Sequence, residues 1–90
     1  MQALIGQFSR FAVESNLTQN DWEMAATEFG VHSKATNINR FYRSWRFGDE
    51  DRQVTAARFL RSVANDDEDV ALGIMRRMHT MADPDQDTLQ

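Results

Sequence analysis

The stretch TQNDWEMAATEFG, residues 18–30, contains the signals for one complete helix. Thr18 followed three residues later by Asp21 is typical of a capping box with a shortened acid, in which both side chains satisfy backbone amides at a helix start. Apolar residues then recur at helical spacing: Trp22, Ala25, Ala26 and Phe29. Gly30 suits the left-handed position that ends many helices. We therefore predict a helix over residues 19–29 with one apolar face.

The same periodicity continues along the chain in both directions. It predicts helices over residues 2–14, from Thr36 to Phe47, from the acidic run 49–51 to Ala64, and from the acidic run 66–69 to Met81. No run of β-branched residues alternates with polar ones for six positions, so no strand pattern competes. The sequence predicts an all-α, compact single-domain bundle of about five short helices over residues 1–82, followed by a flexible acidic tail, residues 83–90.

Composition narrows the range of functions. The 90 residues include no Cys, which excludes a disulfide scaffold, a Cys-based zinc finger and a thiol nucleophile. No apolar run approaches the roughly 20 residues that span a bilayer, and the N-terminal residues lack the basic start of a signal peptide, so we expect a cytoplasmic protein without membrane contact. A domain this small has few side chains for both a core and an enclosed pocket, which favours a binding module.

Catalytic and metal-binding patterns are missing from the sequence. His32 and His79 are the two histidines, and they stand 47 residues apart without metal-ligand spacing. The acidic clusters occupy positions where helix starts favour negative charge. The four glycines are isolated, which excludes a Gly-rich phosphate loop. We expect no catalytic residue, no metal, no cofactor and no enzyme activity.

The strongest functional signal is a local excess of basic residues. The chain carries a net charge of −4, from 10 basic and 14 acidic residues, yet residues 31–48 contain four basic residues and no acid: Lys34, Arg40, Arg43 and Arg46. On one continuous helix over residues 36–47 the three arginines and Asn39 share a side opposite the aromatic residues. We therefore expect an exposed Arg stripe. The planar fork of Arg pairs with phosphates or carboxylates, and Asn37, Asn39 and Ser44 add neutral donors and acceptors at the flanks of the same surface.

Two interpretations of this stripe remain open. In one, Arg40, Arg43, Arg46, Asn39 and Lys34 bind nucleic-acid phosphates, and Arg58 and Arg61, which share the polar face of the next predicted helix, extend the track. In the other, the stripe is an ordinary solvated face whose arginines pair with the acids at 49–51 and 66–69.

Part of the chain resembles a helix-turn-helix unit. The segment Ala26-Thr-Glu-Phe-Gly30-Val31 has a small residue four positions before a Gly with apolar neighbours, and in that family the second helix enters the major groove. The resemblance implies a helix-turn-helix-like pair in the middle of the bundle, although Ile38 and Phe41 come about two residues later than the usual turn allows. In size, helix content and exposed Arg the chain is also similar to small helical subunits of CRISPR ribonucleoprotein complexes, which implies backbone tracking without base reading.

The last predicted helix carries a signal for a protein partner. Leu72, Met75 and His79 widen its apolar sector beyond one face, which is typical of a central helix or of one covered by another chain. The sequence thus leaves two functions. The first is a nucleic-acid-binding module, as a subunit of a ribonucleoprotein or DNA-binding assembly. The second is a helical interaction or adaptor domain, for example of a host-defence system, that forms a homo-oligomer or binds an acidic protein surface.

Overall fold

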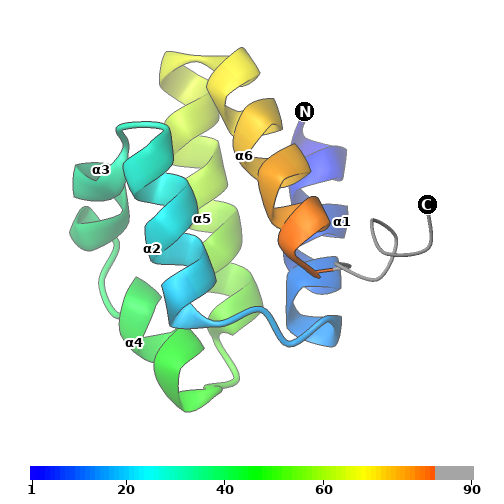
Figure 1. Cartoon of the computed structure of the whole chain (residues 1–90), viewed down its shortest axis with the longest axis vertical. Helices are drawn as coiled ribbons and strands as arrows, with labels where there is room; N and C mark the ends of the chain where they lie inside the picture. The colour runs from blue at the N-terminus through cyan, green and yellow to red at the C-terminus, as the bar shows by residue number, and fades with distance from the viewer. Residues whose placement is uncertain (83–90) are drawn as a thin grey trace.

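The computed structural model describes residues 1–82, and over this range the chain forms six α-helices (Figure 1). They are α1 (Gln2–Glu14), α2 (Gln19–Glu28), α3 (His32–Asn37), α4 (Phe41–Phe47), α5 (Arg52–Asp66) and α6 (Glu68–Ala82). Helix α5 packs against α1, α3, α4 and α6, and α2 packs against α3, α4 and α6. The predicted all-α single domain is confirmed, with six helices in place of about five. The predicted tail, residues 83–90, lies outside the described residues.

An aromatic cluster joins four of the helices. Trp22 of α2 is fully buried, and its ring lies 5.2 to 6.2 Å from four other aromatic rings: Phe8, Phe41, Trp45 and Phe59. These rings come from α1, α4 and α5, and most meet Trp22 edge-on or tilted, as aromatic pairs prefer. The cluster therefore fixes α1, α2, α4 and α5 against one another.

The predicted bounds of the first two helices are confirmed to within one residue. The Thr18 side chain accepts a hydrogen bond from the Asp21 amide, and the Asp21 carboxylate accepts one from the Thr18 amide, which completes the capping box. Gly30 has a φ of 71°, and the Val31 amide donates to the Ala26 carbonyl at 2.8 Å. This arrangement is a Schellman-type ending of α2, as the sequence predicts.

The predicted helix from Thr36 to Phe47 is wrong, because the chain breaks at residues 38–40. Ile38 is extended and Arg40 is left-handed, with a φ of 65°. Ala35 and Ser44 are both buried. They stand nine residues apart, about two and a half helical turns, so one straight helix would point them in opposite directions. The break lets α3 and α4 each turn their own residue inward, and it removes the continuous second helix of the helix-turn-helix-like pair.

A buried polar contact attaches α4 to α5. The hydroxyls of Ser44 and Thr55 lie 3.0 Å apart, and both side chains are nearly inaccessible to solvent. Each hydroxyl also lies within hydrogen-bond distance of a carbonyl on its own helix, that of Phe41 for Ser44 and that of Arg52 for Thr55. Ser44 is therefore part of the core, and the prediction that it flanks an exposed Arg surface is wrong.

The junction between α5 and α6 is sharper than the sequence predicts. Helix α5 continues through Asp66 instead of ending near Ala64, and α6 begins at Glu68. The Asp67 carboxylate accepts a hydrogen bond from the Asp69 amide at 3.0 Å, so this acid satisfies a free amide at the start of α6. None of the helices in residues 1–82 is long and apolar enough to cross a membrane.

Two glycines test how backbone conformation affects stability, because replacing each with Ala should change the free energy of unfolding in opposite directions. An added Cβ meets no atom within 4 Å at either Gly6, inside α1, or Gly48, which follows α4 with a φ of 68°. We expect Gly6→Ala to raise the free energy of unfolding by about 1 kcal/mol, because Ala is the better helix former. We expect Gly48→Ala to lower it by about 1 kcal/mol, because the left-handed backbone strains a side chain. Urea unfolding of both variants measures the two changes. If both substitutions change the free energy of unfolding in the same direction, the assigned backbone conformations of Gly6 and Gly48 are contradicted.

Candidate functional site

Helix α4 presents two arginines and an aromatic ring to solvent. Arg43 and Arg46 are exposed, and their guanidinium carbons lie 5.9 Å and 5.4 Å from the centroid of the Phe47 ring. Phe47 itself is 63 % exposed. Neither arginine takes part in an ion pair within residues 1–82. We call Arg43, Arg46 and Phe47 the Arg–Phe patch.

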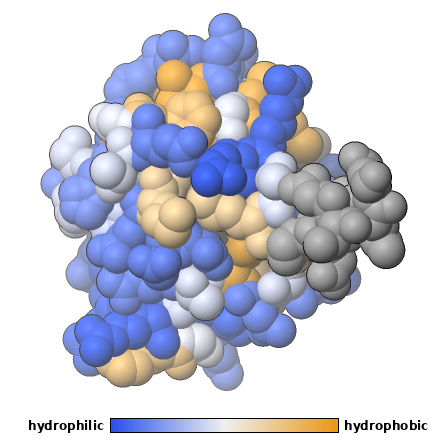
Figure 2. All heavy atoms as spheres, in the orientation of Figure 1, coloured by the Kyte–Doolittle hydropathy of each residue, from blue (hydrophilic) through white to orange (hydrophobic). Residues whose placement is uncertain are grey.

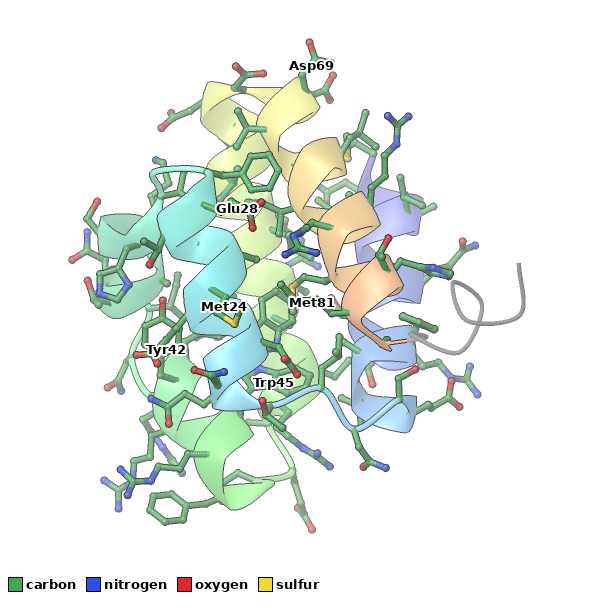
Figure 3. All side chains as sticks on the ribbon, in the orientation of Figure 1. Met24, Glu28, Tyr42, Trp45, Asp69 and Met81 are labelled. Carbon is green, nitrogen blue, oxygen red and sulfur yellow. The ribbon has the colours of Figure 1, made fainter. Side chains whose placement is uncertain are left out.

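The core determines the direction in which this patch faces. Phe41 and Trp45 of α4 are buried against Trp22, so the remaining side of the helix faces outward. In Figure 3, Trp45 lies beneath the start of α2, whereas Tyr42 lies on the side of α4 toward α3. Hydrophobic atoms also reach the surface at the outer end of α4, beside hydrophilic ones (Figure 2).

Two shallow hollows adjoin the patch. Arg43 lines one of about 340 Å³ between α3 and α4, together with Thr36, Asn39 and Tyr42. Arg46 lines another of about 430 Å³ toward α2, whose other lining residues are Thr18, Gln19, Asn20, Glu23 and Trp45. The Trp45 indole N–H is buried and has no hydrogen-bond partner among residues 1–82. Amide, hydroxyl and guanidinium groups therefore line both hollows.

Two of the predicted basic site residues are paired within the domain. The Arg40 guanidinium lies 3.4 Å from the Asp49 carboxylate, and Lys34 forms an ion pair with Asp66. Arg40 also precedes α4 in the left-handed conformation, so it does not continue the helical row of Arg43 and Arg46. The prediction of three free arginines on one helix is wrong for Arg40. Asn39 is exposed and lines the same hollow as Arg43, although it lies in the break between α3 and α4.

The predicted extension of the basic track lies on α5. Arg58 is exposed, while the Arg61 guanidinium donates a hydrogen bond to the Gln2 side chain at 2.8 Å. Arg61 lines a hollow between α1 and α5 with Gly6 and Val54, so its side chain is directed toward α1. The structure places Arg61 with α1 and not with the Arg–Phe patch.

The three residues predicted as a partner interface line one groove. Leu72, Met75 and His79 of α6 border a groove of about 330 Å³ together with Leu4, Phe8 and Arg76. Met75 is only 5 % exposed and belongs to the core, so its predicted role as an exposed contact is wrong. Leu72 is half-buried, and the exposed His79 stacks on Phe11 of α1 with ring centroids 4.8 Å apart. We call this feature the α1–α6 groove.

A hydrogen bond joins the two short helices across the break. His32 Nδ1 lies 2.9 Å from the Tyr42 hydroxyl, and the two rings are stacked 5.5 Å apart. Partial burial, together with the negative charge of Glu23, raises the pKa of Tyr42 to about 12. This contact holds α3 beside α4, so it supports the wall of the hollow that Arg43 lines.

The fold and its surface define a small all-α domain with a basic aromatic patch and an apolar groove. Within residues 1–82, no three His, Asp or Glu side chains are grouped so that they could hold a metal ion. The family model AbiJ N-terminal domain 5 matches residues 4–90, and the chain therefore belongs to this family of helical domains associated with abortive-infection host defence. Comparison with curated proteins and with solved structures gave no significant match.

Phe47 is the site residue that the sequence analysis overlooks. It appears there only as the end of a predicted helix. Its position four residues after Arg43 places it on the same side of α4, and that spacing is the signal that could have identified it.

Tyr42 offers a direct test of the packing between α2, α3 and α4. It is the single Tyr in the chain, so ultraviolet absorbance of the phenolate reports this residue alone. We expect a midpoint near pH 12 in the folded protein, against about 10 in the unfolded chain. Because the folded state holds the proton more tightly, this contribution to stability is complete below pH 10 and is lost as the pH rises toward 12. A titration midpoint of Tyr42 at pH 10 in the folded protein would contradict its packing between α2, α3 and α4.

Proposed function

We propose that this domain is a non-enzymatic, cytoplasmic recognition module of a host-defence protein, and that its Arg–Phe patch binds the phosphates of nucleic acid. The observation that carries the proposal is the pair of exposed guanidinium groups of Arg43 and Arg46, which lack ion-pair partners among residues 1–82. Guanidinium groups pair with phosphate through two parallel hydrogen bonds. Family membership supports the connection with host defence.

The local charge favours an anionic ligand despite the negative total. Three of the fourteen acids lie in residues 83–90, so residues 1–82 carry a net charge of −1. Charges farther than about 8–10 Å are largely screened at physiological salt, so the ligand responds mainly to the groups around α4. Of the acids that follow α4, Asp49 is already paired with Arg40. Glu23 lines the hollow beside Arg46 but is outnumbered by Arg43 and Arg46, so the patch retains a positive local field.

Two phosphate contacts provide only modest affinity. The logarithm of the association constant should fall against the logarithm of salt with a slope of about −1.4 for single strands and about −1.8 for duplex DNA. A functional complex then needs several copies or an attached domain. The family description, an N-terminal domain, supports an arrangement in which this module supplies recognition to a longer protein.

The proposal predicts a charge-specific loss of binding. In Arg43→Gln/Arg46→Gln, both phosphate contacts are removed, so the salt slope should approach zero and retention at low salt should be lost. The matched control is Arg10→Gln/Arg76→Gln, which removes the same charge from exposed arginines on α1 and α6. Fluorescence anisotropy with labelled oligonucleotides at two salt concentrations measures both variants. Equal binding by the two double variants would overturn the proposal.

A second candidate function is self-association through the α1–α6 groove. The supporting observation is Leu4, which is 42 % exposed at the edge of a groove lined by Phe8, Leu72 and Met75. An exposed apolar side chain at the edge of an apolar groove is typical of a surface that binds another protein.

Light scattering distinguishes a self-associating domain from a monomeric one. If copies associate through the groove, Leu4→Asp should convert a dimer into a monomer, because a buried charge at the contact is unfavourable. The matched control is Val54→Asp on α5, since Val54 is 53 % exposed and lies away from the groove. A monomeric mass for the unmodified domain, or equal effects of both variants, counts against self-association.

A further inference from the structure

We infer that the ligand of the Arg–Phe patch is a single-stranded nucleic acid, in which one unpaired base stacks on Phe47 while the flanking phosphates contact Arg43 and Arg46. This inference rests on the proposed function and specifies the ligand of the same patch. It follows from the exposure of Phe47 and from the position of the two guanidinium groups around its ring.

Phe47 differs from the other phenylalanines of the chain. All six lie within residues 1–82; Phe8, Phe41 and Phe59 are buried, Phe11 and Phe29 are half-buried, and Phe47 is 63 % exposed. It ends α4, and the left-handed Gly48 then turns the chain. Hydrophobic residues reach the surface at this end of the helix (Figure 2). A large apolar ring in this position is available to a ligand without any rearrangement of the core.

The surroundings of the ring suit a base better than an aliphatic group. Both guanidinium carbons lie within 6 Å of the ring centroid, the range of a cation–π contact. Aromatic rings and guanidinium planes are the side chains on which unpaired bases stack, and the guanidinium groups also reach phosphate. Arg43, Arg46 and Phe47 therefore combine the two contacts that a single strand offers, a base face and a charged backbone.

Base stacking disfavours a duplex as the ligand. The acids that follow α4 do not decide the matter, because Asp49 is paired with Arg40 and Glu50 lines the hollow between α1 and α5. The bases of a duplex are stacked internally and cannot reach Phe47. A single strand contacts a narrower surface and can turn one base onto the ring.

The experiment compares three oligonucleotides of equal length by fluorescence anisotropy: a single strand of thymidines, an abasic strand with the same phosphates, and a duplex. Phe47→Leu should weaken binding of the thymidine strand roughly ten-fold, because base–aromatic stacking is lost. It should leave the abasic strand and the duplex unchanged. Phe47→Trp should retain binding of the thymidine strand. The exposure of Phe47 keeps both variants folded, which circular dichroism verifies.

The outcomes separate this inference from the proposed function. If Phe47→Leu binds the thymidine strand as tightly as the unmodified domain does, while Arg43→Gln/Arg46→Gln loses it, the base contact is refuted and phosphate binding stands. If the unmodified domain binds none of the three oligonucleotides at low salt, both are refuted. If polyglutamate displaces the thymidine strand as effectively as an unlabelled strand of equal charge, the patch recognises an acidic polypeptide and the inference is refuted.

Discussion

The packing of aromatic rings around Trp22 is the constraint on which the rest of the domain depends. Helix α4 has seven residues, too few to be stable alone in water, so its position relies on Phe41 and Trp45 against Trp22. Because these two rings face inward, the other side of the helix faces solvent with Arg43, Arg46 and Phe47. The functional surface is thus a consequence of the core, since the same seven residues supply both.

Local signals in the sequence predict the first third of the fold well. The capping box of Thr18 and Asp21 and the left-handed Gly30 determine α2 through contacts between near neighbours, and such contacts can be recognised from spacing alone. The break at residues 38–40 has no comparable local signal. It depends on burial of both Ala35 and Ser44, and a left-handed Arg40 is an uncommon choice at such a position. Information about distant packing is needed to predict it.

The same distinction between local contacts and distant packing explains which site residues the sequence predicts correctly. Helical spacing predicts that Arg43 and Arg46 share an exposed side, because both lie within one short helix. The pairing of Lys34 with Asp66 joins residues 32 positions apart. The sequence pattern suggests pairing with the acids at 66–69 only for the arginines, in the second of the two interpretations of the stripe. Met75 is a second example of distant packing. The helical pattern leaves it as an apolar residue that could be exposed, but the neighbouring helices bury it. Phe47 is absent from the predicted site because the sequence pattern marks a residue at a helix end only as a boundary.

The contact between Ser44 and Thr55 restricts which pairs of residues can occupy these two positions. Two hydroxyl protons serve three short oxygen contacts, so in any one arrangement one contact lacks a proton. Replacing one hydroxyl with a methyl group leaves the other with fewer partners in a dry interior, whereas replacing both together removes the requirement. Members of the family should therefore exchange these two positions as a unit, polar with polar or apolar with apolar. Mixed combinations should be rare, and a library of paired substitutions at the two positions would show the same bias.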